Sequence, residues 1–211
     1  MTGVGDPSRI LLFGGTFDPP HMAHVTLPPL AAAKLRCDRI IYVPARISPL
    51  KTGSPPTDAA HRLEMLRLAL RGVPNASISA IELEREGPSF TIDTVKAFKV
   101  ADTELFLLLG ADQALDFHRW RAWEEIVRIA APVVLLRPPW TRDAFAVRLA
   151  ETYSQGEAGS WLSRTLDGDL PLIDVSASDV RRRVRAGRSI DGLVPAAVAA
   201  YVAAHGLYRQ L

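Results

Sequence analysis

The stretch that decides the fold runs from Ile10 to His24 and has the sequence ILLFGGTFDPPHMAH. It opens with a hydrophobic run that has the length of a buried parallel strand. Gly14 and Gly15 follow this run and predict a sharp turn at which a ligand can approach the backbone. A strand that ends in glycines and leads into a helix predicts an anion site built from backbone N–H groups and the helix dipole. His21 lies one helical turn before His24, so both side chains can face that site.

Hydrophobic runs alternate with helical patterns along the whole chain, which predicts βαβ units and a parallel sheet. Pro28 and Pro29 predict a late start or a kink in the first helix. Glycine and serine are scattered through 154–168, so we expect that segment to be the least organised. The expected strands are 10–13, 39–43, 77–83, 105–109, 133–136 and 170–175. The expected helices are 31–35, 58–70, 91–100, 123–130, 143–153, 178–186 and 195–205.

Polar clusters follow several of the expected strands, directly after the residue at which each strand ends. In an open α/β sheet, ligands bind beyond the carboxyl ends of the strands. Packing alone gives little reason for polar residues to gather repeatedly at that edge, so the pattern predicts a ligand site there. The clusters are 14–24, 48–51, 110–112, Arg137 and 176–181.

A second motif, VSASDVR, covers 175–181. Ser178 is expected to cap the following helix, and Arg181 then lies in its first turn, where a guanidinium can reach an anion at the helix N-terminus. More arginines follow at 182, 183, 185 and 188. These four are interpreted as the solvated face of a helix, with a nucleic-acid patch as the minor alternative.

The composition is that of an ordinary globular protein, with 211 residues, 48% hydrophobic residues and a formal net charge of +2. We expect one domain over 1–211, with 1–8 as a loose N-terminal extension. Cys37 is the only cysteine, which excludes an internal disulfide framework and a cysteine-rich zinc site. The first residues lack the apolar core of a signal peptide, and no apolar run has the length of a membrane span. A cytoplasmic location is expected, with the oligomeric state left open.

The segment GGTFDPPHMAH resembles the signature of nucleotidyltransferases that carry a (T/H)-x-G-H motif, with Ala23 where glycine is usual. Its GGTFDP-x-H form is most similar to nicotinate-nucleotide adenylyltransferases of bacterial NAD synthesis. VSASDVR resembles the I-S-S-T-x-I-R motif of the same family, and the resemblance spans about 10–209. It implies a doubly wound, Rossmann-like α/β fold, in which helices cover both faces of a parallel sheet in a single domain.

The resemblance also implies the substrates, ATP and nicotinate mononucleotide, and the residues that bind them. The segment PSFT at 88–91 resembles P-S-(Y/F)-T, GADQ at 110–113 with a later Trp resembles G-x-D-x…F…W, and 49–51 has leucine where P-H-K is common. The implied ATP-binding residues are Gly14, Gly15, Thr16, Phe17, His21, His24, Ser176, Ser178 and Arg181. The implied mononucleotide-binding residues are Lys51, Phe90, Thr91, Asp112, Trp120 and Arg137. The implied catalytic residues are His21, His24, Lys51 and Arg181.

The implied reaction is adenylyl transfer, and its nucleophile is an oxygen of a phosphate monoester. The second pKa of such a phosphate is near 6, so the nucleophile is largely ionised at neutral pH and needs no general base. Catalysis then consists of aligning two anions and neutralising the charge that develops on pyrophosphate. Mg²⁺ is expected to enter with ATP, held mainly by phosphates and water and not by a metal site of the chain.

Two alternatives stay open. One is a sister transferase that acts on phosphopantetheine or nicotinamide mononucleotide; the aromatic pair Phe90 and Trp120 argues against the first, and an assay is needed to exclude the second. The other is a nucleic-acid-binding protein that uses the helix from Arg181 to Arg188. The small net charge argues against it, and a salt-dependent RNA shift assay would separate the two classes. We expect neither a nucleic-acid nor a membrane partner.

Overall fold

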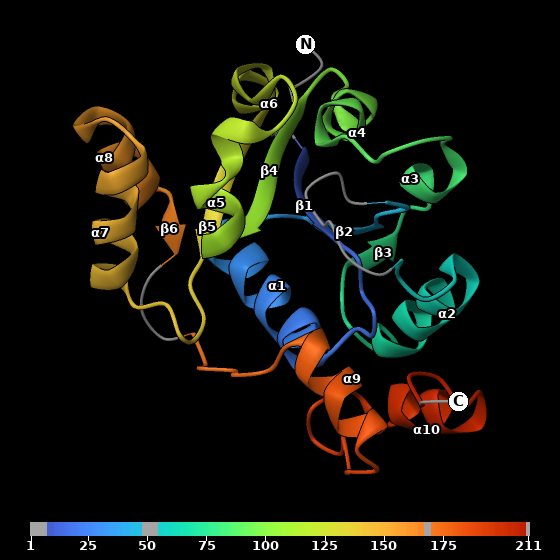
Figure 1. The fold of residues 1–211 in the computed structure, drawn as a ribbon. Coiled ribbons are helices and arrows are strands. Elements are labelled where there is room, and N and C mark those ends of the chain that lie inside the picture. The colour runs from blue at the N-terminus through green and yellow to red at the C-terminus, as the bar shows by residue number, and fades with distance from the viewer. Residues whose placement is uncertain (1–7, 48–54, 167–169, 210–211) are drawn as a thin grey trace.

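The computed structural model describes residues 8–47, 55–166 and 170–209. Its centre is a six-stranded sheet in the order β3-β2-β1-β4-β5-β6, and all five strand pairings are parallel (Figure 1). The strand order reverses between β1 and β4, which is the point where open α/β sheets bind ligands. The strands are β1 (Ser8–Gly15), β2 (Arg39–Pro44), β3 (Ala76–Ile78), β4 (Thr103–Gly110), β5 (Ala130–Leu135) and β6 (Thr165–Leu166).

Helices cover both faces of this sheet, which confirms the expected doubly wound fold class (Figure 1). Because successive strand residues point to opposite faces, Leu11 belongs to the core cluster that includes residues of α1, α2, α9 and α10, whereas Leu12 belongs to the cluster that includes residues of α4 to α8. The helices are α1 (Met22–Lys34), α2 (Ala59–Ala69), α3 (Ile81–Glu84), α4 (Thr91–Phe98), α5 (Ala111–Leu115), α6 (Trp123–Ile129), α7 (Arg142–Thr152), α8 (Gln155–Ser163), α9 (Ala177–Arg185) and α10 (Ala196–Ala204), with a 3₁₀ turn η1 (Phe117–Arg119).

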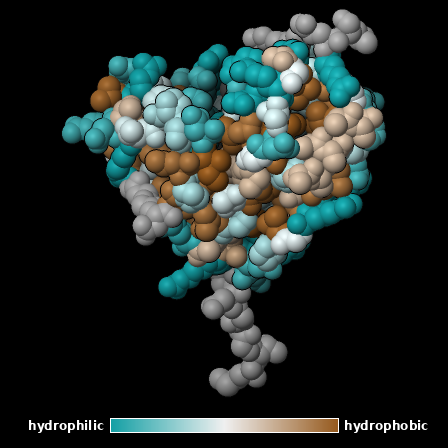
Figure 2. Space-filling view, turned by 90° about the horizontal axis from the view of Figure 1, so that it is seen from below, coloured by the Kyte–Doolittle hydropathy of each residue, from teal (hydrophilic) through white to brown (hydrophobic). Residues whose placement is uncertain are grey.

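The strands are apolar on both sides because both sides are covered. In β4, the whole run 105–109 is buried, as expected for a central parallel strand. Seen from below in Figure 2, apolar residues gather in the middle of the face and hydrophilic residues surround them. Figure 1 shows α9 close to the N-terminal end of α1, and the N–H of Met22 donates to the carbonyl of Leu193 at 2.9 Å. The two sequence motifs therefore lie on neighbouring elements.

The expected late start of the first helix is wrong, because α1 begins at Met22 and continues through Pro28 and Pro29. A proline lacks an N–H group, so Pro28 cannot bond to the carbonyl of His24, four residues earlier. The buried hydroxyl of Tyr42 donates to that carbonyl instead, at 3.0 Å. A contact from β2 thus supplies the hydrogen bond that the proline removes.

Four other expectations fail, three of them in the less regular parts of the chain. The segment 154–168 contains α8, because Ser154 and Glu157 cap its N-terminus and Trp161 is buried. The expected strand 170–175 lies outside the sheet, whose sixth place β6 occupies by pairing with Val134 and Leu135. The expected strand 77–83 ends at Ile78, and α3 follows it. Ser8 belongs to β1 and bonds to the carbonyl of Asp102, so it is not part of a loose extension.

Candidate active site

The loop after β1 does not turn where the glycines suggested. Gly14 pairs with Val43 and Gly15 with Pro44 inside the sheet, and neither has a positive φ. The turn lies at Phe17, whose φ is 52° and whose side chain is buried. A Cβ atom at Gly15 would come within 3.0 Å of the Phe17 ring. Gly15 is therefore needed to make room for that ring, and the predicted turn at the glycines is wrong by two residues.

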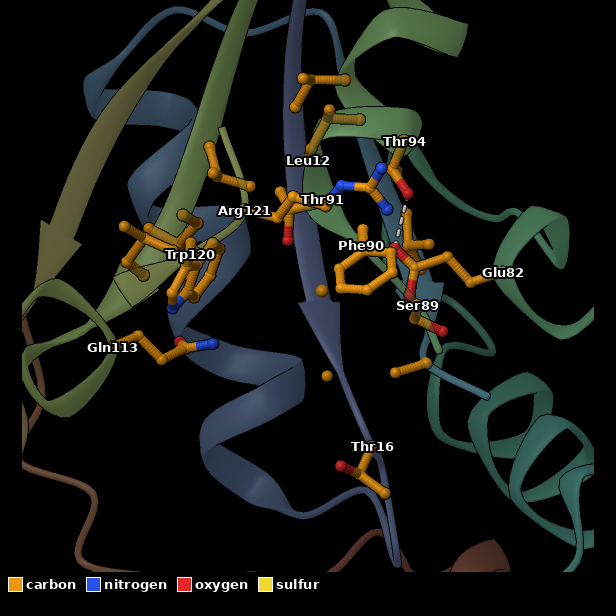
Figure 3. A pocket seen from close by; sticks show the side chains of 18 of the residues that line it. Leu12, Thr16, Glu82, Ser89, Phe90, Thr91, Thr94, Gln113, Trp120 and Arg121 are labelled. Carbon is orange, nitrogen blue, oxygen red and sulfur yellow. Dashed lines mark hydrogen bonds between the residues drawn. The ribbon is translucent and has the colours of Figure 1, made fainter. Parts of the chain in front are cut away.

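A cavity of about 280 Å³ lies over the carboxyl halves of β1 and β4. Figure 3 shows Phe90 and Trp120 on opposite sides of it and Thr16 at its lower end. An aromatic pair that faces a cavity suits a flat ring as ligand. The cavity brings together six of the predicted site residues, namely Gly14, Gly15, Thr16, Phe90, Thr91 and Trp120.

The indole of Trp120 is held in place from one side. Its ring centroid lies 4.9 Å from that of Phe117, which is fully buried at the start of η1. The indole N–H is buried and has no hydrogen-bond partner among the residues that the structure describes. A buried donor without a partner costs about 1–3 kcal/mol, so Trp120 sits in a position that packing alone does not favour.

Two residues of the cavity were missed by sequence reasoning. Glu82 is buried, and its carboxylate accepts a hydrogen bond from the hydroxyl of Thr94 at 2.6 Å. The expectation of a strand over 77–83 hid it, because it lies in α3. The guanidinium of Arg121 lies 4.8 Å from the centre of the Phe90 ring. Its position directly after Trp120 was the signal that could have revealed it.

His21 and His24 lie at the start of α1, where the sequence predicted them to lie together. His21 is only 3% exposed, and its ring stacks on that of His24 with centroids 3.6 Å apart. Burial, followed by the positive charge of Arg137, lowers the pKa of His21 from its ordinary value of 6.5 to about 3. His21 is therefore a neutral imidazole at physiological pH, able to donate one N–H without carrying charge.

Arg181 reaches across the chain to the loop of the first motif. Its Nη1 donates to the carbonyl of Asp18 at 2.6 Å, although the two residues are 163 positions apart. The buried carboxylate of Asp18 accepts from the hydroxyl of Tyr208 at 2.6 Å and from the N–H of Thr57 at 3.1 Å. The start of α9 and the C-terminal segment are thereby tied to the residues that lead into His21.

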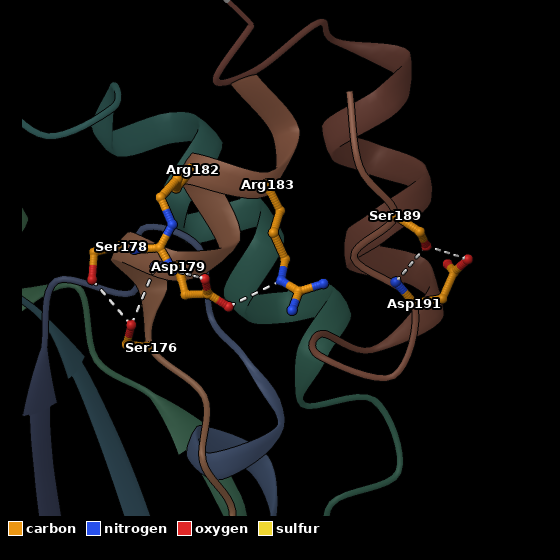
Figure 4. Close-up of polar contacts among 7 residues, drawn as sticks. All are labelled: Ser176, Ser178, Asp179, Arg182, Arg183, Ser189 and Asp191. Atoms are coloured by element: carbon orange, nitrogen blue, oxygen red, sulfur yellow. Dashed lines mark hydrogen bonds and ion pairs between the residues drawn. The ribbon is translucent and has the colours of Figure 1, made fainter. Parts of the chain in front are cut away.

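Ser176, and not Ser178, caps α9 (Figure 4). The Ser176 hydroxyl accepts from the N–H of Asp179 at 3.2 Å, and the Ser178 hydroxyl lies 3.0 Å from that of Ser176. The predicted cap was wrong by two residues because the helix begins at Ala177. The Asp179 carboxylate forms ion pairs with Arg182 and Arg183, as Figure 4 shows, while Arg185 and Arg188 are exposed.

Three predicted site residues remain to be placed, namely Arg137, Asp112 and Lys51. Arg137 donates to the carbonyl of Val175 at 2.8 Å, just before the cap of α9, and its charge acts on His21. The exposed Asp112 accepts from the indole N–H of Trp140 at 3.1 Å and is not among the described residues that line the cavity. The predicted contact with a ligand at Lys51 lies outside the described residues.

Arg62 is a third residue that sequence reasoning missed. Its side chain is 1% exposed, and it donates to the carbonyls of Thr16, Ala45 and Thr57, each at 2.8 Å. These carbonyls belong to the loops that follow β1 and β2 and to the start of α2. An arginine on an amphipathic helix is usually interpreted as surface, so nothing in the local sequence distinguished it.

The described part of the chain contains no group of three or more His, Cys, Asp or Glu side chains placed to hold a metal ion. None of its helices is long and apolar enough to cross a membrane. The guanidinium-bearing residues Arg119 and Arg121 line the cavity. The loop that follows Thr16 leads from the cavity to the stacked imidazoles of His21 and His24 and to the contact of Arg181 with Asp18. Such groups suit an anionic ligand such as a phosphate.

Comparison with known proteins agrees with this arrangement. Residues 12–183 match the family model described as cytidylyltransferase-like. A probable nicotinate-nucleotide adenylyltransferase of Bordetella petrii is 41% identical, covering 95% of this chain and 99% of that protein. One from Thermomicrobium roseum is 39% identical, covering 97% and 93%. The nicotinic acid mononucleotide adenylyltransferase of Plasmodium falciparum, complexed with NaAD, shares the fold with a TM-score of 0.73 at 19% identity, covering 95% and 97%. The chain therefore belongs to the nicotinate-nucleotide adenylyltransferases, within the cytidylyltransferase-like nucleotidyltransferases.

Proposed function

We propose that this protein transfers the adenylyl group of ATP to nicotinate mononucleotide, giving nicotinate adenine dinucleotide and pyrophosphate. The observation that carries the proposal is the cavity that joins the glycines of β1 to the facing rings of Phe90 and Trp120. It places a site for a flat ring beside the loop that leads to His21 and His24. The names of the relatives at about 40% identity support the same substrates.

The reaction joins two anions. A phosphate oxygen of the mononucleotide attacks the α-phosphorus of ATP, and the bond from that phosphorus to the oxygen bridging to the β-phosphorus breaks. Pyrophosphate leaves with the electron pair. Because the nucleophile is already ionised near neutral pH, the protein needs to align the reactants and to stabilise charge on the leaving group. No covalent enzyme intermediate is needed.

The chain's own residues divide this work. Neutral His21 donates a hydrogen bond without repelling the nearby Arg137. His24 and Arg181 donate further hydrogen bonds to the triphosphate. ATP is also contacted by the backbone of 14–17 and by the hydroxyls of Ser176 and Ser178. For the mononucleotide, Trp120 stacks on one face of the pyridine ring, and Phe90 and Thr91 contact the ring from the opposite side of the cavity. Arg137 binds the phosphate. Asp112 and Lys51 stay proposed contacts to the ribose and phosphate.

Mg²⁺ fits this site as a companion of ATP. The Asp18 oxygens accept from Tyr208 and Thr57, and Asp112 accepts from Trp140, so these carboxylates near the site already have partners. The phosphates and water would hold the ion, and it would supply charge neutralisation on the triphosphate. The chain would then contribute donors and alignment and not a metal cage.

Product analysis tests the proposal. Purified protein is incubated with ATP, Mg²⁺ and nicotinate mononucleotide, and the products are separated by chromatography and weighed by mass spectrometry. We expect nicotinate adenine dinucleotide and pyrophosphate in equal amounts. Absence of the dinucleotide, or formation of an adenylylated product only with phosphopantetheine, would refute the proposal.

A further inference from the structure

We propose that Tyr42 is a positioning residue of the adenylyl transfer, which acts by fixing the place of His24 from inside the core. The inference rests on the proposed function, in which His24 donates a hydrogen bond to the triphosphate. Tyr42 lies in β2, its side chain is fully buried, and it is not among the described residues that line the cavity. It can therefore influence the reaction only through the residues that it contacts.

The first contact joins the Tyr42 hydroxyl to the backbone of His24. The hydroxyl donates to the His24 carbonyl at 3.0 Å. In an α-helix this carbonyl would accept from the N–H four residues later, but that residue is Pro28, which has no N–H. Burial raises the pKa of the Tyr42 hydroxyl, so the hydroxyl keeps its proton and stays a donor. A side chain of the sheet thus holds the peptide group that follows His24.

The second contact joins the Tyr42 ring to the rings that surround the His24 imidazole. The Tyr42 centroid lies 5.6 Å from that of Phe13 and 6.0 Å from that of Phe17. The same two rings lie 5.8 and 5.1 Å from the imidazole of His24. Edge-to-face and tilted pairs at such distances are favourable. Both ends of the Tyr42 side chain therefore act on the position of His24.

Tyr42 can fix His24 because the sheet fixes Tyr42. In the sheet it pairs with Phe13 of β1 and with Ile78 of β3, and its carbonyl accepts from the N–H of Ser79 at 2.9 Å. A displacement of a group that aligns reactants by about 1 Å can cost about a hundredfold in rate. A smaller displacement of the His24 donor, with its ring still packed, should lower kcat and leave substrate binding nearly unchanged.

The test removes only the hydroxyl, in Tyr42→Phe, which keeps the ring and its contacts with Phe13 and Phe17. Steady-state kinetics with ATP, Mg²⁺ and nicotinate mononucleotide should show kcat lowered about tenfold, with both KM values changed less than about twofold. A kcat equal to that of the wild type would overturn the proposal. A wild type that forms no dinucleotide would instead refute the proposed function, before any variant is measured.

The two prolines of α1 provide a rescue and its matched control. Pro28→Ala restores the backbone N–H that bonds to the His24 carbonyl, so adding it to Tyr42→Phe should recover most of the lost kcat. Pro29→Ala restores an N–H to the carbonyl of Val25 and should recover none. Both paired variants are assayed even if Tyr42→Phe is unstable, so a folding defect leaves their comparison intact. Equal kcat values in the two pairs would contradict the proposal.

Two further readouts separate positioning from general support of the fold. In the His24→Ala background, adding Tyr42→Phe should not lower kcat further, because the residue through which Tyr42 acts is gone; a further loss would contradict the proposal. The ring nitrogen resonances of His24 in NMR need no activity. They should shift in Tyr42→Phe and return when Pro28→Ala is added, whereas those of the exposed His118 in η1 should stay in place. Unshifted His24 resonances would overturn the proposal.

Discussion

The imidazole rings of His21 and His24 are stacked, with their centroids 3.6 Å apart and their planes inclined by 17°. The backbone N–H of His21 donates to Nδ1 of His24 at 3.2 Å, which fixes the His24 ring and leaves its other nitrogen to carry the proton. The two rings thus form one preorganised unit at the start of α1, beside the cavity loop. Hydrogen bonds from such a unit require no rearrangement when the transition state forms.

The first prediction concerns the chemical role of His21. If it donates a hydrogen bond and transfers no proton, His21→Ala should lower kcat about a hundredfold, as expected for losing one transition-state donor. His21→Asn, which keeps a donor, should recover part of that loss. Steady-state kinetics at saturating substrates measures both. An asparagine variant no faster than the alanine variant would point to proton transfer.

The second prediction is a pH dependence of stability. The pKa of His21 is about 3 in the folded protein and near its ordinary value of 6.5 when unfolded, so the unfolded state binds more protons below pH 6.5. This contribution to stability is fully present above pH 6.5 and is lost as the pH falls toward 3. Between pH 7.5 and 5.5, the wild type should lose about 1.4 kcal/mol more unfolding free energy than His21→Gln. Urea titrations at both pH values measure it, and parallel losses would contradict it.

The sequence sufficed for the central strands β1, β2, β4 and β5, because they are covered on both faces and therefore appear as continuous apolar runs. It failed where distant contacts decide the local structure. Helix α1 passes through two prolines because Tyr42 bonds to the carbonyl that Pro28 leaves free. Helix α8 contains Gly156 and Gly159, which suggest a loop, but its capping box and the burial of Trp161 stabilise it.

The candidate site, like the fold, has a part that the sequence predicted and a part that depends on contacts between distant residues. The motifs identified six residues that line the cavity, namely Gly14, Gly15 and Thr16 at the end of β1, Phe90 and Thr91 at the start of α4, and Trp120 directly after η1. The spacing of residues gave no sign of the contact between Arg181 and Asp18, because it depends on how α9 docks beside α1. Nor did it indicate that buried Arg62 holds the loops after β1 and β2. Such contacts follow from the fold and not from a local pattern.

The third prediction concerns Trp120. If its indole stacks on the pyridine ring, Trp120→Ala should raise KM for the mononucleotide at least about tenfold, a loss of roughly 1.4 kcal/mol. The KM for ATP should stay nearly unchanged, and Trp120→Phe should be milder because it keeps a stacking face. Thermal unfolding serves as the control for folding. A parallel rise of both KM values would mean that Trp120 only packs on Phe117.

The fourth prediction separates Arg181 from the basic residues that follow it. Arg181 contacts the motif loop, whereas Arg182 and Arg183 pair with Asp179, and Arg185 and Arg188 are exposed. Arg181→Lys should lower kcat/KM for ATP despite the preserved charge, because lysine cannot copy a bidentate contact. Arg181→Ala should be worse.

Arg188→Ala is the matched control for this series, and it should change kcat/KM for ATP by less than about twofold, as expected for an exposed side chain. Equal and mild effects at all five arginines would contradict a phosphate contact at Arg181. Graded losses of RNA affinity, each reducing the salt slope by about one unit, would indicate a nucleic-acid surface instead.

The central claim is that the cavity between Phe90 and Trp120 selects nicotinate mononucleotide as the acceptor of the adenylyl group. The most direct test is pyrophosphate release by the purified protein with ATP, Mg²⁺ and a panel of mononucleotides. We predict that kcat/KM for nicotinate mononucleotide exceeds that for nicotinamide mononucleotide by at least about tenfold, or roughly 1.4 kcal/mol. Equal values, or a preference for the amide, would contradict the claim.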